Sequence, residues 1–567
     1  MIADRGLLES LRATALTPGT NLRGGALGAA WTYLLPSQRI GRLVCVGEPS
    51  QAALARLMVI AEQVDLLPGR RAARRWALTA EAEGWAGLRV LADAQGLHQQ
   101  YDLAWATRGA RHDWIEVAYR AARLRYRERR SIRLRGSKGA PSAAPAGGDA
   151  LVVRLGPWLG EVRLAVPVAD RVVADYVRER RLEEAGLRDA LAARGVPRAG
   201  AVARILHLGD EPTRRFVRTG RLAGLPGPDP LLLPAYLRTL DPETFGSYGW
   251  ALSASGAYRT KKVLFHLFAS GHRSPELIVK LVSHAADAPL LEQAYQGLTA
   301  ARECGITALG RAPEPIMLAR PDGVTALVER MIDGRPFETQ SRGTADCPVA
   351  LDALEGLIEI GERTRRSAAP GAVAAELGAI VERFIDLYRP AGHVRAVLGD
   401  AVALIGQSPE PFPIVGMHGD AGRQNLLVDR DGRVVFLDWE RWEPAGLPLW
   451  DIAHFIRSYV TWATRRSRPM SRLAALKMQF VDGGSLTPFV ARALEDGARR
   501  LGIEPRLVAP LVLTSFAAEA VREAERLESQ RRASGSFVRA LELLCSSLDA
   551  PVTRRLLGIG ATDGTVP

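Results

Sequence analysis

Apolar residues in the last third of the chain follow a helical period that one pair of short strands interrupts. Over residues 348–404 they recur every three or four positions, which predicts helices. The apolar runs 426–428 and 434–437 are short, and the turn between them carries Gly432, where a positive φ is expected. Helices are expected again from 451 to about 548. The pattern therefore places one β-hairpin inside a mostly helical region.

The first part of the chain alternates short apolar runs with helical patterns. The run at 42–47 is followed by a short loop and a helix expected at about 51–64, which is how a Rossmann-like unit begins. The G-x-G-x-x-G fingerprint is absent, and only Gly47 stands at the turn. A methyltransferase-like domain, a nucleotide-sugar-like domain and an α/β domain without a cofactor all fit. So weak a motif favours the last.

Changes of composition divide the chain, which at 567 residues is too long for one ordinary domain. Residues 136–149 are rich in Pro, Gly, Ala and Ser and show no periodicity, so we expect a flexible linker there. After it, the pattern predicts strands at 151–155, 161–166, 202–208 and 214–217, and a helix at about 169–193. We predict an α/β Rossmann-like domain at 1–135, the linker, an α+β middle region at 150–240, a β-rich lobe at 241–340 and a mostly helical lobe at 341–567.

The stretch 417–425, Met-His-Gly-Asp-Ala-Gly-Arg-Gln-Asn, carries the clearest chemistry. His-x-Asp-x-x-x-x-Asn is the spacing of a kinase catalytic loop, in which the Asp positions the attacking hydroxyl and the Asn holds a metal ion. These residues are Asp420 and Asn425, and Asp438 follows at the end of the hairpin. Mg²⁺ prefers oxygen ligands and keeps several waters, so one carboxylate and one amide suffice. We expect the hairpin to bring Asp438 beside Asn425, where both reach one Mg²⁺ ion.

These motifs, with Leu-Asp-Trp-Glu at 437–440 and Gly-Leu-Pro-Leu-Trp-Asp-Ile-Ala at 446–453, resemble those of the aminoglycoside phosphotransferase and choline kinase superfamily. The resemblance covers about residues 240–567. It implies a protein-kinase-like fold of two lobes and phosphorylation of a small molecule. It also implies that Asp420 is the catalytic base, that Asn425 and Asp438 bind the metal, and that Asp451 anchors the catalytic loop.

The nucleotide-binding half of such a kinase is expected to begin near residue 248. Ser255 and Gly256 stand in a turn between two strand candidates, 248–252 and 263–268, where backbone N–H groups can cover phosphates. With one Gly, the turn matches the Gly-rich loop of protein kinases poorly. We nevertheless assign both residues to the nucleotide site.

Lys280 is one of only five lysines in this chain, and it interrupts the apolar strand 276–282. A flexible point charge in that context is expected to contact the α- and β-phosphates of the nucleotide. Glu292, in the first turn of a helix expected from about 288, is the candidate to pair with it, with stabilisation of the helix dipole as the alternative. Backbone groups from Glu329 to Met331, after the strand that begins at 325, are expected to bind the adenine edge.

The chain is strongly basic, with a net charge of +13, but its basic residues are spread widely and aromatic residues make up 6%. We therefore expect no specific nucleic-acid partner. The densest basic run, 120–138, is predicted to be a solvated helix end, with a phosphate-rich or acidic partner as the alternative. Four distant cysteines indicate a reducing compartment. No apolar stretch is long enough for a membrane span, and no signal peptide is evident, so we expect a cytoplasmic protein.

The sequence thus predicts a Mg²⁺-dependent enzyme that transfers the γ-phosphate of ATP or GTP to a hydroxyl of a small molecule. A sugar, an amino alcohol or an aminoglycoside-like compound would fit as the acceptor. The carboxylates of the C-terminal region form no clear acidic cradle, so an aminoglycoside is not favoured. Two alternatives are a nucleotide-binding regulatory module and a bifunctional enzyme with an N-terminal methyltransferase-like or glycosyltransferase-like domain.

Overall fold

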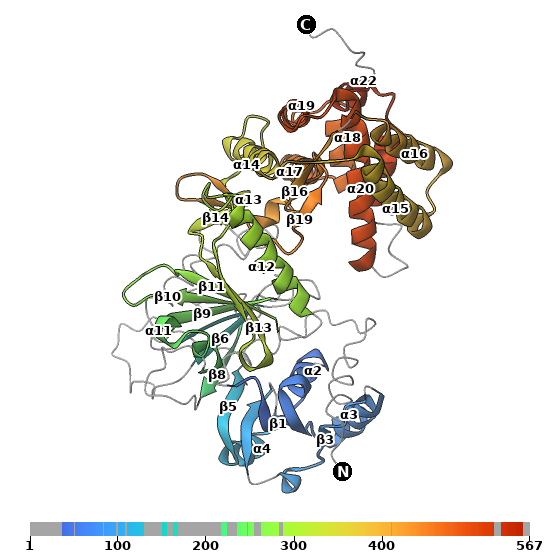
Figure 1. Cartoon of the computed structure of the whole chain (residues 1–567). Helices are drawn as coiled ribbons and strands as arrows, with labels where there is room; N and C mark the ends of the chain where they lie inside the picture. Colours follow the sequence, from blue (N-terminus) through green and yellow to red (C-terminus); the bar gives the residue numbers. More distant parts are fainter. Residues whose placement is uncertain are drawn as a thin grey trace. The chain divides into compact units, whose positions relative to one another are not determined.

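The computed structural model describes fourteen segments of the chain, which divides into two compact units (Figure 1). The first unit comprises Met1–Glu292 and Ile316–Met331, and the second comprises Gln293–Pro315 and Ile332–Pro567. The described residues are 37–49, 51–82, 84–97, 100–107, 110–129, 150–155, 163–167, 217–223, 235–245, 248–254, 262–282, 287–409, 411–526 and 535–559.

Five parallel strands form one end of the sheet in the first unit, in the order β3-β2-β1-β4-β5. Their bounds are Ile40–Val46 for β1, Ala61–Leu67 for β2, Leu88–Val90 for β3, Tyr101–Ala106 for β4 and Ala122–Arg129 for β5. Helices α2 (Gln51–Ile60), α3 (Arg70–Ala82) and α4 (His112–Arg120) alternate with them along the chain. This is the α/β pattern that the sequence predicts for the region.

Alternate side chains of β1 enter two different cores, which shows that helices cover both faces of the parallel strands. Leu43 and Cys45 belong to a cluster with residues of α2 and α3, including Leu57 and Trp76. Their neighbours along the strand face the opposite core, where Ile115 of α4 packs. A strand buried on both faces reads as a continuous apolar run, which is why the sequence predicts it well.

Two predicted elements of this region differ in the structure. The helix expected to run to about residue 64 ends at Ile60, and β2 begins at the next residue. Of the basic run 120–138, Arg120 does end helix α4, but 122–129 form strand β5, with Arg123 and Arg125 exposed. In both places a buried parallel ladder overrides the local preference of the sequence.

The sheet continues beyond β5 through mostly antiparallel strands into the predicted kinase-like region. The order after β5 is β8-β6-β7-β9-β10-β11-β13-β12. The bounds are Val217–Ala223 for β8, Ala150–Leu155 for β6, Arg163–Pro167 for β7, Gly249–Ala254 for β9, Val263–Phe268 for β10, Leu277–Val282 for β11, Thr325–Arg330 for β13 and Pro315–Ala319 for β12. The strands β1–β13 therefore form one sheet.

The predicted strands at 151–155 and 161–166 correspond to β6 and β7, whereas β8 begins only at the last residue of the strand expected at 214–217. The linker 136–149, the helix 169–193 and the strand 202–208 lie outside the described residues. The domain boundaries given above stay predictions.

The second unit is mostly helical. Its helices are α13 (Phe337–Gln340), α14 (Pro348–Thr364), α15 (Pro370–Tyr388), α16 (Gly392–Gly406), α17 (Trp450–Ser467), α18 (Arg472–Phe480), α19 (Thr487–Leu501), α20 (Val508–Arg526), α21 (Ser536–Cys545) and α22 (Pro551–Leu556), while α12 (Ala288–Glu303) spans the border between the units. Its strands are β14 (Gly334–Pro336), β15 (Arg366–Ala368), β16 (Phe412–Met417), β17 (Leu426–Asp429), β18 (Val434–Phe436) and β19 (Glu443–Gly446). The predicted hairpin is β17–β18, and Gly432 in its turn has φ +82°.

Among the described residues, no single helix is long and apolar enough to cross a membrane. Two segments joined by a bend, Thr487–Leu501 and Pro505–Ala524, together have the length and composition of a membrane span.

A buried carboxylate, Asp65 of β2, fixes one edge of the parallel strands. It accepts two hydrogen bonds from Arg89 of β3, at 2.8 and 2.6 Å, and one from the hydroxyl of Tyr101 of β4, at 2.5 Å. Burial raises the pKa of this carboxyl, but the bonds from Arg89, Tyr101 and Gln63 together outweigh it and hold the pKa below the ordinary value. Three strands are therefore joined by one ionised side chain.

Asp65→Ala is expected to lower the free energy of unfolding by about 1.5–3 kcal/mol at neutral pH, because it leaves the groups that bind the carboxylate without their partner. Urea denaturation followed by tryptophan fluorescence measures the change. Because the folded-state pKa is depressed, the stabilisation is present above the unfolded pKa and is lost as pH falls through the folded value. Asp113→Ala, which breaks only the exposed pair with Arg111, is the control and should change little.

Candidate active site

The predicted catalytic loop begins directly after β16 and turns sharply at Gly419. This residue has φ +78°. A Cβ atom on it would lie 2.2 Å from the carbonyl oxygen of Arg441 and 2.9 Å from its Cβ. A side chain would therefore need both a disfavoured backbone conformation and a displacement of the neighbouring chain. The Gly of the His-Gly-Asp motif is required by the close approach of two backbones.

Asp451, in the first turn of α17, holds this turn in place. Its carboxylate accepts hydrogen bonds from the backbone N–H groups of His418, at 2.5 Å, and Gly419, at 3.0 Å. Burial raises the pKa of Asp451 above its ordinary value, against the lowering effects of His418 and the two N–H groups. The anchoring contact that the family resemblance implies for Asp451 is present.

His418 connects the catalytic loop to the end of the hairpin. Its ring is fully buried and packs against the rings of Phe436 and Trp439. Nε2 lies 2.8 Å from the carbonyl oxygen of Leu437, and the backbone N–H of Asp420 donates to Nδ1 at 3.3 Å. A carbonyl only accepts and an N–H only donates, so the proton resides on Nε2. The ring thus joins the residue before Asp438 to Asp420 itself.

Asn425 stands between Asp420 and Asp438 in the sequence, and it is bound to the chain beside each of them. Its side-chain Nδ2 donates to the carbonyl oxygen of Asp420 at 2.9 Å, and its own carbonyl accepts the N–H of Leu437 at 2.8 Å. The second bond brings Leu437, the residue before Asp438, next to Asn425. Asp438 has φ +61°, a left-handed conformation that Asp tolerates better than most residues and that is common at functional sites. The expected approach of the strand end to Asn425 is confirmed, while the roles of the three residues stay predictions.

A second group of charged side chains, from α17 and α20, lies next to Asp420. Nε2 of His454 is 3.5 Å from Oδ1 of Asp420, and its Nδ1 is 3.7 Å from Oε2 of Glu519. Burial lowers the pKa of His454, although both carboxylates act in the opposite direction. The guanidinium of Arg457 stacks over Phe537 at 3.7 Å, and burial lowers its pKa to about 10.

Sequence reasoning missed His454 and Arg457, and it named Glu519 only among the acidic residues of the C-terminal region. The available signal was their spacing on α17, where His454 follows Asp451 by three positions and Arg457 follows His454 by three, since residues three positions apart are neighbours on a helix surface.

In the first unit, Lys280 is buried in β11 and pairs with Glu329 of β13. Its Nζ lies 2.9 Å from Oε1 of Glu329, and both side chains are at least nine-tenths buried. Ile278 lies opposite Glu329, so Lys280, two residues further, is its diagonal neighbour on the same face. The predicted pair with Glu292 is wrong, because that carboxylate binds Arg320. The cause is the register of two antiparallel strands, which the sequence does not reveal.

The face that carries Lys280 also carries a buried His266, which lies 2.9 Å from the hydroxyl of Ser253. The register places these residues on one side of β9, β10 and β11, while Leu252, Phe265 and Val279 point to the apolar core on the other. This half of the sheet therefore has one polar and one apolar face.

The structure bears on one of the two remaining predicted nucleotide contacts, the adenine contact at Met331, and not on the turn at Ser255 and Gly256. The backbone N–H of Met331 donates to the carbonyl of Glu276 at 2.8 Å, so the sheet already uses this donor of the expected adenine contact. Ser255 and Gly256 lie outside the described residues.

Residues 264–499 match the model of the phosphotransferase enzyme family, APH. This segment is a phosphotransferase-family domain. The match contains Lys280, the catalytic loop and the hairpin, and it confirms the family that the motifs resemble.

No curated protein matches the chain. Among solved structures, a choline/ethanolamine kinase family protein from Mesorhizobium loti is 19% identical, with a TM-score of 0.30, over 57% of this chain and 96% of its own. Choline kinase LicA from Streptococcus pneumoniae is 13% identical, with a TM-score of 0.30, over 50% and 89%. Aminoglycoside phosphotransferase APH(3'')-Id from Streptomyces rimosus, in complex with ADP and streptomycin, is 18% identical, with a TM-score of 0.29, over 55% and 97%. At these TM-scores the structures carry no weight for the activity of this chain.

Gly419→Ala is expected to displace the catalytic loop and to lower phosphotransferase activity about 100-fold, because shifts near 1 Å have effects of that size. Gly432→Ala is the matched control, since Gly432 also has a positive φ but an added Cβ there would meet nothing within 4 Å. Initial rates and thermal unfolding of both variants separate crowding at the loop from backbone strain alone. Equal activity in the two variants would contradict the role given to the close approach at Arg441.

Glu329→Gln is expected to destabilise the protein by about 3–5 kcal/mol, the usual effect of removing one partner from a buried ion pair. Glu292→Gln changes the carboxylate that the sequence predicts to pair with Lys280, and its partner in the structure, Arg320, is mostly exposed. It should therefore have little effect. Urea denaturation of the two variants side by side provides the measurement, and a larger loss in Glu292→Gln would reverse the assignment of the partner.

Proposed function

We propose that the protein is a kinase that transfers the γ-phosphate of ATP or GTP to a hydroxyl group of a small molecule. The observation that carries the proposal is the hydrogen-bonded loop in which Asp451 and His418 fix Asp420 beside Asn425 and the strand end that leads to Asp438. The family match supports a phosphotransferase. A catalyst for phosphoryl transfer needs chiefly aligned groups and charge neutralisation, which a rigid loop of this kind supplies.

Asn425 and Asp438 are the residues that would hold Mg²⁺. The amide nitrogen of Asn425 is used by the carbonyl of Asp420, which leaves its oxygen as the group available to a cation. One carboxylate and one amide oxygen suit a magnesium ion that keeps most of its waters. When bound, the ion would neutralise charge on the nucleotide phosphates.

Asp420 is assigned to the acceptor. Its carboxylate would accept the proton of the attacking hydroxyl while the hydroxyl oxygen forms a bond to the γ-phosphorus and the bond from phosphorus to the β–γ bridging oxygen breaks. Nε2 of His454, 3.5 Å from Oδ1 of Asp420, orients this carboxylate. Lys280, buried and paired with Glu329, is assigned to the α- and β-phosphates.

The groups around Asp420 disfavour an acceptor that carries several positive charges. Glu519 is bound by Arg522 at 2.7 Å, and Glu523 accepts hydrogen bonds from the hydroxyl of Ser536 and the N–H of Phe537. These carboxylates are already used within the protein, so they do not form an open acidic cradle. A sugar or an amino alcohol is the acceptor class we favour, and an aminoglycoside-like compound is the less favoured one.

Asp420→Asn and Asp438→Ala are each expected to lower the transfer rate at least 100-fold with the fold intact, since one removes the base and the other the metal ligand. The assay is a screen with Mg²⁺ and ATP or GTP over hydroxylated metabolites and aminoglycosides. Asp431→Asn, an exposed change in the turn of the same hairpin, is the control and should keep full activity. Unchanged turnover in both active-site variants would refute the assignment. Nucleotide binding without any product would favour the regulatory module.

A further inference from the structure

The five parallel strands of the first unit reverse their order between β1 and β4. From β1 the chain adds β2 and then β3 on one side, and β4 and then β5 on the other. In open α/β sheets, ligands bind in the crevice outside the carboxyl ends of the strands at such a reversal. The place where a ligand would bind is therefore fixed by topology, even though the sequence lacks a glycine fingerprint.

Backbone hydrogen bonds bring the carboxyl ends of the central strands to one level. Val46 of β1 lies opposite Leu67 of β2 and Ala106 of β4. The N–H of Gly47 donates to Leu67, and the N–H of Thr107 donates to Val46, both at 2.9 Å. Gly47 has φ +100°, and a Cβ atom there would lie 2.1 Å from the hydroxyl of Thr107. The single Gly of the predicted turn thus lets two strand ends meet at the reversal.

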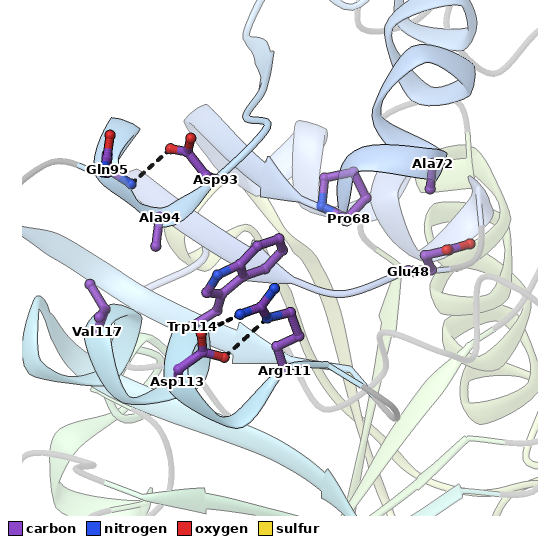
Figure 2. Close-up of a pocket in the computed structure, with 11 residues that line it drawn as sticks. Glu48, Pro68, Ala72, Asp93, Ala94, Gln95, Arg111, Asp113, Trp114 and Val117 are labelled. Atoms are coloured by element: carbon purple, nitrogen blue, oxygen red, sulfur yellow. Dashed lines mark hydrogen bonds and ion pairs between the residues drawn. The ribbon is translucent and has the colours of Figure 1, made fainter.

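A pocket of about 780 Å³ lies at this edge of the sheet (Figure 2). Its size is within the range of small-molecule and cofactor sites. The residues that line it belong to the segments that come directly after strands β1, β2, β3 and β4 in the sequence. The lining residues used below are Glu48, Pro68, Asp93, Arg111, Asp113 and Trp114.

Among the residues that the structure describes, one carboxylate of the pocket has no ion-pair partner. Glu48 pairs with Arg75, and Arg111 pairs with Asp113, both within 2.6 Å. Asp93 accepts the N–H of Gln95 with Oδ1 at 3.0 Å, and among the described residues no basic side chain pairs with it. A pocket of this charge suits a neutral or cationic ligand and disfavours a phosphate.

Trp114 provides the aromatic surface of the pocket. In Figure 2 its indole ring stands in the middle of the lining residues, with Asp93 on one side and Arg111 on the other. The guanidinium of Arg111 lies over this ring, 4.7 Å from its centroid. Arg111 is tied down by Asp113, so one side of the indole is supported. Planar rings stack on aromatic side chains with little dependence on their identity.

We propose that this pocket binds a nucleoside that carries no phosphate group, with its base on Trp114 and a hydroxyl, amino or cationic group on Asp93. The sequence favours an α/β domain without a cofactor, because it lacks a phosphate-binding fingerprint. A phosphate-free nucleoside needs no such fingerprint. The proposal is independent of the proposed kinase activity, since all the residues that carry it lie between 46 and 117.

The test is isothermal titration of the full chain with adenosine and with S-adenosylmethionine, a cationic nucleoside. A non-hydrolysable ATP analogue and Mg²⁺ are kept at saturation, so that a nucleotide site elsewhere is occupied. Saturable binding of either probe is expected, with AMP and NAD binding at least ten-fold more weakly. No saturable binding of either nucleoside, or equal binding of AMP, would overturn the proposal.

Substitutions in the pocket test whether the nucleoside binds there. Trp114→Ala is expected to weaken it about ten-fold, while Trp114→Tyr, which keeps a ring, retains most of it. Asp93→Asn keeps an acceptor for Gln95 and should weaken the cationic probe more than adenosine. Leu78→Ala, at an exposed position of α3 that does not line the pocket, is the control. Circular dichroism establishes that each variant is folded, and unchanged affinity in a folded Trp114→Ala would place the ligand elsewhere.

Discussion

The geometry of the candidate active site depends on one buried carboxylate that accepts two backbone N–H groups. Asp451 binds the turn at His418 and Gly419, and that turn has no room for any residue except glycine. Because an unpaired buried N–H or carboxylate is costly, the two groups hold each other in one arrangement. The positions of Asp420 and Asn425 then follow from covalent geometry and from one further bond between them. The groups that we assign to the reaction are thus held in place by atoms to which we assign no part in it.

In the first unit, the constraint is a single sheet that contains both parallel and antiparallel strands. Its parallel strands are buried on both faces and end at a pocket, while its antiparallel strands carry a buried Lys280–Glu329 pair on one face. Parallel strands are connected by helices that cover both faces of the sheet, so the side chains on both faces are buried. Antiparallel strands need no such helices, and one of their faces can carry polar side chains. The same sheet therefore ends at a pocket on its parallel side and carries a buried ion pair on its antiparallel side.

The sequence predicted features that depend on residues close together in the chain, and it missed features that depend on contacts between distant segments. The catalytic loop, the hairpin and the strand of Lys280 are local patterns, and they are where the spacing places them. The partner of Lys280 was missed because it depends on the register of β11 against β13. The ring of His454 was missed because it meets Asp420 only after α17 packs beside the loop. The strand β5 was missed because Arg123 and Arg125 are exposed, and an exposed basic run suggests a solvated helix from local composition alone.

By itself, the sequence determined the family of residues 264–499 and predicted the residues that would perform phosphoryl transfer, because these lie in short motifs whose spacing is set by one loop and one hairpin. It also determined the alternation of strands and helices near the N-terminus. Only the tertiary structure decided which carboxylate pairs with Lys280, which side chains surround Asp420, and that the N-terminal strands reverse their order above a pocket. Strand order and register are set by contacts between distant segments, and no local pattern in the chain encodes them.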